Sequence, residues 1–238
     1  MRAAVAFLTV LGGPARPNGR TVAWFPAVGA AIGLALGGVW WLSAEIWPPL
    51  LAAAVVVAAD LAITGLLHVD GLADSADGLL PPLDSRARRL AVMADPSTGA
   101  FGVAAVAAML LLRVGALASI QPDALALAAI WCASRTLMAV AALDLTYSRP
   151  DGLASDFVGP DARRLVWPVG LGGMVLAGVL AALAGGWHGL AALAAATLGA
   201  LAVLWLAHRR IGGFTGDVLG AAAVTAETAG LLALAARV

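Results

Sequence analysis

The stretch LLAAAVVVAADLAITGLLHVDGLADSADGLL, residues 50–80, contains the two features that decide the fold. Its first part, residues 50–67, is an apolar run with one charged residue, Asp60. A helix needs about 20 mostly apolar residues to cross the core of a bilayer. The second part places three aspartates within eight positions. A carboxylate beside a membrane is costly to keep ionised unless another group pairs with it.

Comparable apolar runs recur along the whole chain. Of its 238 residues, 62% are hydrophobic and 12% are charged, and the mean hydropathy is +0.95. Soluble domains carry about 25% charged residues. We therefore expect an all-α, polytopic integral membrane helix bundle, with residues 1–238 forming one membrane-embedded domain. The seven predicted spans are 22–44, 50–67, 100–119, 124–143, 166–185, 188–206 and 217–236.

The arginines are distributed unevenly between the connecting segments. Eleven of the fourteen fall in residues 1–21, 68–99, 144–165 and 207–216, and the other three connections contain none. The positive-inside rule assigns arginine-rich segments to the cytoplasm. This predicts a cytoplasmic N-terminus and a C-terminus on the opposite side. Most aspartates lie in the same segments, so we expect a functional site that faces the cytoplasm.

The spacing of Asp70, Asp74 and Asp77 corresponds to one stripe of a helix, because residues at i, i+4 and i+7 share a face. Like charges so placed repel, which predicts a cation between them. Carboxylate oxygens suit Mg²⁺, Mn²⁺ or Ca²⁺. The neighbouring Gly71 and Gly78 would let phosphate groups approach the backbone. The alternative is a solvated acidic loop, since Asp-Gly pairs usually mark turns.

His68 lies two positions before the first aspartate of this stripe. An imidazole there could be a general base, a ligand or a histidine packed at a helix interface. From the spacing alone, we favour a histidine packed at a helix interface.

The segment ADPSTGAFG, residues 94–102, precedes the third predicted span. Ser97 or Thr98 can cap the helix, and Gly99 lies where it opens. Unpaired N–H groups at a helix N-terminus bind anions, and Asp95 could add a metal ligand. The alternative is an ordinary N-cap followed by a turn.

GGFTGDVLGA, residues 212–221, has the same character at the start of the last span. Thr215 and Gly216 are candidates for binding an anion. Asp217 is either a metal ligand or the N-cap of the helix.

Besides Asp217 at the start of the last span, four charged residues lie inside predicted spans: Asp60, Arg113, Arg135 and Glu227. Ser134 adjoins one of them. Ionised side chains at this depth are expected to have partners. Asp60 could pair with either arginine, and such pairs could hold helices together or contact a substrate.

Several function classes find no support in the sequence. The Walker A loop and the G-x-G-x-x-G, H-E-x-x-H and G-x-S-x-G motifs do not occur. No basic stripe for nucleic acid is present. The polar segment 144–165, which includes Arg149, is either a solvated connector or a mobile loop over a site.

The aspartate stretch HVDGLADSADGL closely resembles the H-L-D-G-L-A-D-x-x-D-G signature of the adenosylcobinamide-GDP ribazoletransferase family. Five further segments are similar to that family's segments in order and spacing: AFLTVL (6–11), WFPAVGAAIG (24–33), MADPSTGAFG (93–102), ASRTL (133–137) and GGFTGDVLGA. The chain departs from the family at Ser97 and Val10, where the family often has basic residues. The family's final span often carries more than one glutamate, whereas here only Glu227 is obvious.

The resemblance implies an activity. A member of this family joins α-ribazole or α-ribazole 5′-phosphate to adenosylcobinamide-GDP and releases GMP, the final nucleotide-loop assembly step of adenosylcobalamin synthesis. It would need Mg²⁺ and would lie in the prokaryotic cytoplasmic (inner) membrane. A homo-oligomer or an association with other corrinoid-assembly enzymes is compatible with this assignment.

The resemblance also suggests roles for individual residues. Asp70, Asp74 and Asp77 would be Mg²⁺ ligands, with Asp95 and Asp217 as further ligands. His68 or an aspartate would accept the hydroxyl proton, and Arg135 would balance phosphate charge. The catalytic candidates are thus His68, Asp74 and Arg135, and the substrate-binding candidates are Gly71, Gly78, Ser97, Thr98, Gly99, Ser134, Thr215, Gly216 and Glu227.

Two other activities compete with this reading. A membrane phosphotransferase that transfers a CDP-linked alcohol to a lipid also uses an aspartate-rich motif, but its alanine-arginine pair is replaced here by Ala73 and Asp74. An ion-coupled transporter could use the charges inside the spans. Against a transporter, the densest charge lies outside the spans and no inverted repeat is visible.

Overall fold

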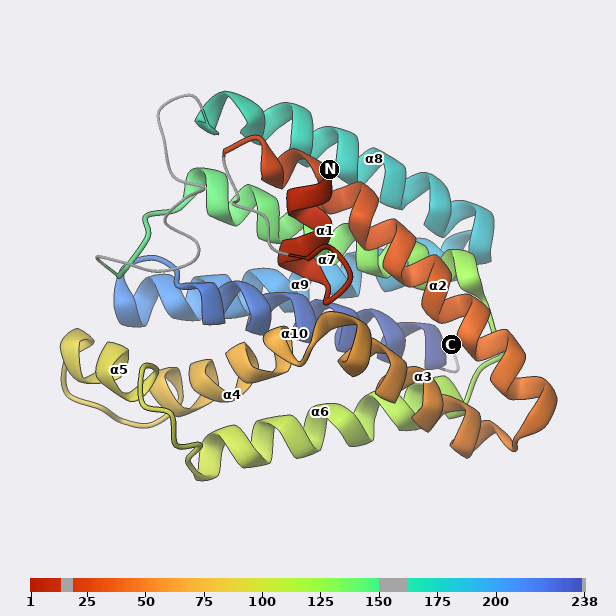
Figure 1. Ribbon diagram of the computed structural model, residues 1–238, viewed down its shortest axis with the longest axis horizontal. Helices are drawn as coiled ribbons and strands as arrows, with labels where there is room; N and C mark the ends of the chain where they lie inside the picture. Colours follow the sequence, from red (N-terminus) through yellow and green to blue (C-terminus); the bar gives the residue numbers. More distant parts are fainter. Residues whose placement is uncertain (14–18, 150–161, 237–238) are drawn as a thin grey trace.

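The computed structural model describes residues 1–13, 19–149 and 162–236. The described part of the chain is helical, as expected, and its longer helices extend between the same two ends of the bundle at varied angles (Figure 1). The elements are α1 (Arg2–Leu8), η1 (Thr21–Trp24), α2 (Phe25–Ile46), α3 (Pro49–Thr64), α4 (Leu67–Leu79), α5 (Arg86–Val92), α6 (Ala100–Ala118), α7 (Ala124–Asp144), η3 (Ala162–Leu165), α8 (Val166–Gly185), α9 (Trp187–Ile211) and α10 (Gly216–Ala235).

Helix α7 lies at the centre of the bundle, where it packs against α2, α8, α9 and α10. Three glycines of α2, at positions 29, 33 and 37, face it. A Cβ at Gly29 would lie 2.4 Å from the Trp131 carbonyl oxygen, and one at Gly33 would lie 2.5 Å from that of Leu127. Small residues at intervals of four let two membrane helices approach closely. The glycine pattern of residues 24–33 therefore fixes the contact between α2 and α7.

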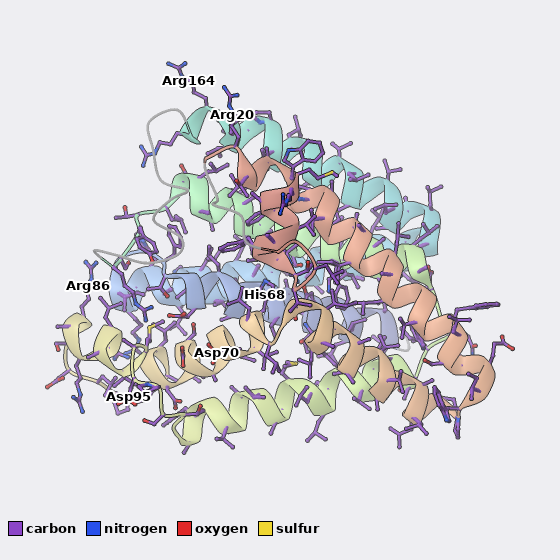
Figure 2. All side chains as sticks on the ribbon, in the orientation of Figure 1. Arg20, His68, Asp70, Arg86, Asp95 and Arg164 are labelled. Atoms are coloured by element: carbon purple, nitrogen blue, oxygen red, sulfur yellow. The ribbon has the colours of Figure 1, made fainter. Side chains whose placement is uncertain are left out.

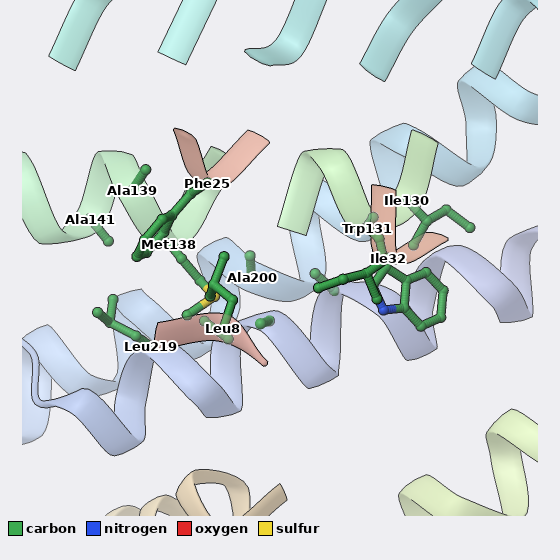
Figure 3. Close-up of a cluster of buried hydrophobic side chains, with 14 of the residues drawn as sticks. Leu8, Phe25, Ile32, Ile130, Trp131, Met138, Ala139, Ala141, Ala200 and Leu219 are labelled. Carbon is green, nitrogen blue, oxygen red and sulfur yellow. The ribbon is translucent and has the colours of Figure 1, made fainter. Parts of the chain in front are cut away.

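The apolar core extends from this contact towards α1 and α10. Leu8, Phe25, Met138 and Leu219 converge there from four different helices (Figure 3). Large apolar side chains on the outer surface, such as Leu111, Trp167 and Leu183, are highly exposed. Exposed apolar side chains in such number suit a bundle surrounded by lipid rather than water.

Six helices of the described residues are long and apolar enough to cross a membrane on their own. They correspond to six of the seven predicted spans, and the largest difference is at the end of α9, which reaches Ile211 instead of residue 206. The chain is therefore a polytopic α-helical membrane protein.

The remaining predicted span, residues 50–67, differs from the expectation. Helix α3 ends at Thr64, and α4 begins at Leu67 at an angle of 91° to it. Gly65 and Leu66 both adopt positive φ angles, of 60° and 63°, and form the break. A helix of 16 residues is about 24 Å long, less than the hydrocarbon core of about 30 Å. Only α3 and α4 together are long enough to cross.

Candidate active site

The aspartate stripe lies on α4, so the expected helix is present. Asp70 is exposed, Asp74 is partly buried and Asp77 is buried. Helix α4 packs against α10 and α6. A Cβ at Gly71 would lie 2.7 Å from the Asp217 carbonyl oxygen. Glycine is thus required for α4 to approach α10 closely enough to bring Asp217 beside the stripe.

The result is a concentration of negative charge around Asp74. Its carboxylate is repelled by those of Asp217, Asp70 and Asp77 and attracted by the guanidinium of Arg149. The predicted repulsion along the stripe is therefore present. It also involves Asp217, which lies 140 residues further along the chain than Asp77.

Asp77 differs from the other members of this cluster, because both of its oxygens already accept hydrogen bonds. The Gly99 amide donates to one at 2.7 Å and the Gly102 amide to the other at 2.9 Å. Asp77 thus binds the N-terminus of α6 from a neighbouring helix. The expectation that the Gly99 amide is open to a phosphate is wrong in this structure, since a carboxylate of the protein occupies it.

The sequence predicted that Ser97 or Thr98 caps α6, but neither side chain does so. Asp95 organises the segment before the helix instead. The Asp95 carboxylate accepts a hydrogen bond of 2.9 Å from the Ser97 amide and a second one from the Ser97 hydroxyl. These bonds hold the pKa of Asp95 below its usual range. Asp95 is not among the charged groups that act on Asp74, so the structure does not bring it into the cluster around Asp74.

Gly78, expected to give phosphate access to the backbone, faces the protein interior. A Cβ there would lie 2.2 Å from Cγ of Met93. The Arg89 guanidinium donates to the carbonyl oxygens at 78, 79, 81 and 83. Because these carbonyls lie at and beyond the end of α4, Arg89 holds the C-terminal end of the acidic helix in place.

At the start of α10 the N-cap is Thr215, whose hydroxyl accepts a hydrogen bond from the Val218 amide. Asp217 is therefore not the N-cap, the alternative considered above, and lies in the first turn. There it forms an ion pair of 2.9 Å with Arg149. Gly216 has open space beside it among the described residues.

A cavity of about 270 Å³ opens beside this ion pair. Its polar wall includes Asp70, Asp217 and Arg149, and Gly216 lies beside them. Its inner wall includes His68, which is 3% exposed. The other lining residues are Phe7, Leu67, Met138, Tyr147, Leu219 and Gly220.

The charges inside the spans form a separate, buried network. Arg113 pairs with Asp60 at 2.7 Å and also with Glu227, which in turn pairs with Arg135. The Ser134 hydroxyl donates to Glu227 at 2.9 Å. Arg135 was expected to balance phosphate charge, but its charge is balanced by Glu227. The structure favours the alternative in which these residues hold α3, α6, α7 and α10 together.

The part of the chain that the structure describes contains no group of three or more His, Cys, Asp or Glu side chains arranged to hold a metal ion by themselves. Mg²⁺ commonly takes one or two protein carboxylates and completes its shell with water and substrate phosphates. Asp70 and Asp74 can provide such a partial site, while each oxygen of Asp77 accepts a backbone hydrogen bond and one oxygen of Asp95 accepts two hydrogen bonds from Ser97.

Arg149 is the main site residue whose role the sequence did not indicate. Besides Asp217, it binds the Met93 carbonyl oxygen at 3.1 Å. The short pairing of Tyr147 with Phe214 brings its segment to the start of α10. An arginine in a polar, acidic segment was the available signal, but nothing in the sequence indicated its partner. Residues 150–161 of segment 144–165, for which the sequence left open a connector or a mobile loop, lie outside the described residues.

The fold and site together define a polytopic membrane protein with an acidic, partly buried site at one end of its helix bundle. A family model described as cobalamin-5-phosphate synthase matches residues 1–235. The chain belongs to this family.

Named relatives match along most of their length. A protein from Pseudomonas paraeruginosa is 39% identical over 91% of this chain and 87% of its own, and one from Stutzerimonas stutzeri is 40% identical over 94% and 89%. One from Bradyrhizobium diazoefficiens is 37% identical over 99% and 93%. All three are named adenosylcobinamide-GDP ribazoletransferase. No solved structure matches the chain.

Proposed function

We propose that the protein is an adenosylcobinamide-GDP ribazoletransferase. A ribose hydroxyl of α-ribazole, or of its 5′-phosphate, attacks the phosphorus attached to cobinamide. A P–O bond forms to the ribose oxygen, and the bond between this phosphorus and the bridging oxygen of GMP breaks. The hydroxyl proton passes to a base on the protein, and GMP leaves. The observation that carries the proposal is the family match over residues 1–235, with relatives of that name at 37–40% identity.

The acidic cluster supports this chemistry. Displacing GMP from a diphosphate requires the reacting groups to be held in line and the phosphate charge to be neutralised. The protein's own charge around Asp74 is negative and would repel a diphosphate. Mg²⁺, held by Asp70 and Asp74 with Asp217 nearby, would neutralise the phosphate oxygens. The residues therefore fit a partial Mg²⁺ site that the substrate completes.

The other residues around the cluster have distinct tasks. Arg149 keeps Asp217 in place through their ion pair and adds a positive charge at the cavity mouth. Gly216, with open space beside it, exposes the first turn of α10 to the substrate. Asp77 holds the start of α6 against α4 through its two backbone hydrogen bonds. The group that accepts the hydroxyl proton is then His68 or an aspartate that does not bind the metal.

The distribution of arginines supports a site that faces the cytoplasm. Arg86 binds the Ser148 carbonyl oxygen at 3.3 Å, and Arg149 binds that of Met93, so the segments around α5 and after α7 lie together. Figure 1 shows α5 at the same end of the bundle as the starts of α6 and α10. All these segments are among those that the positive-inside rule assigns to the cytoplasm.

The assay is direct. Purified protein in lipid nanodiscs is incubated with adenosylcobinamide-GDP, α-ribazole and Mg²⁺, and adenosylcobalamin and GMP are quantified. We expect both products in equal amounts, and no product after chelation of the metal.

Two carboxylate variants separate the site from general effects of charge. Asp74→Ala should reduce turnover at least 100-fold. Glu45→Ala removes an exposed carboxylate near the end of α2 and should leave turnover unchanged. If the wild-type protein forms neither product, the proposed function is wrong; if Asp74→Ala retains full turnover, only the assignment of Asp74 is wrong.

A further inference from the structure

His68 is buried beside the cavity, and its ring lacks partners. Its side chain is 3% exposed, and neither ring nitrogen has a hydrogen-bond partner among the described residues. A buried polar group without a partner is destabilising. An imidazole offers both a donor and an acceptor when neutral. A ligand in the cavity can supply the missing hydrogen bond, because His68 is part of the cavity wall.

The cavity has two chemically different ends. Asp70 is exposed, and the side chains of Asp217 and Arg149 are about one-fifth exposed, so they lie near solvent. His68 and Leu219 are buried, and they form the inner end. Figure 2 labels His68 where α4 begins, beside α10. The cavity therefore suits a ligand with an apolar inner part and a polar outer part.

The volume and the walls restrict the ligand further. A cavity of about 270 Å³ is slightly smaller than the pockets of about 300–1,000 Å³ that enclose drug-sized ligands, so a corrinoid cannot enter. Phe7, Leu67, Met138 and Leu219 provide apolar surface for a flat ring. His68 is the buried polar side chain among the lining residues described.

We propose that this cavity binds the aromatic base of the ribazole substrate, with a hydrogen bond between His68 and the unsubstituted ring nitrogen of the base. This inference rests on the proposed function and assigns the subsite for one of its two substrates. The ribose then lies towards Asp70 and Asp217, where its hydroxyl meets the reacting phosphate. His68 selects the aromatic base of the substrate, and an aspartate accepts the hydroxyl proton.

The guanine of the second substrate is the other nitrogen heterocycle available. Its edge carries several donors and acceptors, which would each need a partner in the cavity. A benzimidazole riboside has one free ring nitrogen and otherwise apolar edges. At the inner end of the cavity, the buried imidazole and its apolar neighbours therefore match the benzimidazole and leave most of a guanine edge placed there unsatisfied.

The test is equilibrium binding by titration calorimetry, with purified protein in detergent and without corrinoid or metal. The probes are α-ribazole, its indole counterpart, which lacks the ring nitrogen, and GMP. We expect the wild-type protein to bind α-ribazole about tenfold more tightly than the indole riboside, as loss of one hydrogen bond predicts. GMP should not compete with α-ribazole.

Variants assign this preference to the imidazole. His68→Leu should bind both ribosides equally, and His68→Gln should keep part of the preference. His188→Leu, at an exposed histidine near the start of α9, should behave like the wild type. Equal binding of the two ribosides by the wild type, displacement of α-ribazole by GMP, or an unchanged preference in His68→Leu would each overturn the inference.

The comparison of probes with wild-type protein holds even if a His68 variant does not fold. It also separates this inference from the proposed function. If the protein turns over its substrates but binds both ribosides equally, the proposed activity stands and the proposed subsite is wrong. If it prefers α-ribazole but shows no turnover, the subsite stands and the proposed activity is wrong.

Discussion

The Gly102 amide donates a hydrogen bond of 2.9 Å to the Asp77 carboxylate, and a Cβ at position 102 would lie 2.5 Å from the second oxygen of that carboxylate. The same holds at Gly99, where a Cβ would lie 2.6 Å from Asp77. Glycine at both positions therefore makes room for a carboxylate that binds the start of α6. This contact gives the third aspartate of the stripe a structural task.

Replacing Gly102 by alanine should displace Asp77 and weaken the contact between α4 and α6. Overfilling a packed site costs about 1–3 kcal/mol, so we expect a lower melting temperature in detergent. Gly115→Ala is the matched control, because it lies in the same helix with open space around it among the described residues. It should be neutral or slightly stabilising, as alanine favours helix. Equal losses in both variants would show that the Asp77 contact is unimportant.

Neutralising Asp74 should stabilise the protein while it abolishes activity. Burial and the repulsion of three neighbouring carboxylates outweigh the attraction of Arg149 and disfavour the ionised form of Asp74, and Asp74→Asn removes this charge without changing the size of the side chain. We expect a higher melting temperature than that of the wild type in the absence of metal. Mg²⁺ should raise the melting temperature of the wild type by binding the folded state, and should have little effect on the variant. A lower melting temperature of Asp74→Asn without metal would contradict the repulsion described here.

Removing Glu227 should destabilise the bundle strongly. It pairs with both Arg113 and Arg135, which would keep buried charges without sufficient compensation. Breaking a buried ion pair by removing one partner costs about 3–5 kcal/mol. We expect Glu227→Gln to lose this stability and to keep its turnover per folded molecule at low temperature.

The double variant Glu227→Gln/Arg135→Met tests the electrostatic cause. It removes one charge of each sign and leaves the Asp60–Arg113 pair of 2.7 Å. It should recover much of the melting temperature lost in the single variant. Similar melting temperatures for the single and double variants would mean that shape, not charge, explains the effect. A loss of turnover per folded molecule in Glu227→Gln would instead indicate that Glu227 contacts the substrate.

The sequence predicted those parts of the structure that depend on local patterns. Apolar runs located six spans, since length and hydropathy are properties of each helix alone. The i, i+4, i+7 spacing placed Asp70, Asp74 and Asp77 on one helix. The contacts of Asp77 with α6 and of Arg149 with Asp217 join residues 22 to 68 positions apart. Nothing in the local pattern specifies such partners, so their tasks were not predicted correctly.

The break between α3 and α4 was also not predictable. Gly65 is compatible with a turn, but the neighbouring Leu66 adopts a φ angle of 63°, which is unusual for leucine. The surrounding apolar residues indicated a continuous span. Beyond the turn, α4 packs against α6 and α10 through contacts that involve Gly71 and Asp77 and join it to distant parts of the chain.

The topology gives the last prediction, because the bent pair α3–α4 either crosses the membrane or returns to the side it entered from. If it crosses, the N-terminus and residue 85 lie on the same side; if it returns, they lie on opposite sides. The arginines of α5 favour a cytoplasmic residue 85, and α5 lies at the end of the bundle where α6 begins (Figure 1). We therefore expect epitope tags at the N-terminus and at residue 85 to be cytoplasmic, and a C-terminal tag to be outside. Antibody binding to intact and permeabilised cells measures all three. Accessibility of the residue 85 tag in intact cells, with the N-terminal tag protected, would identify α3–α4 as a re-entrant pair and place the acidic cluster on the outer face.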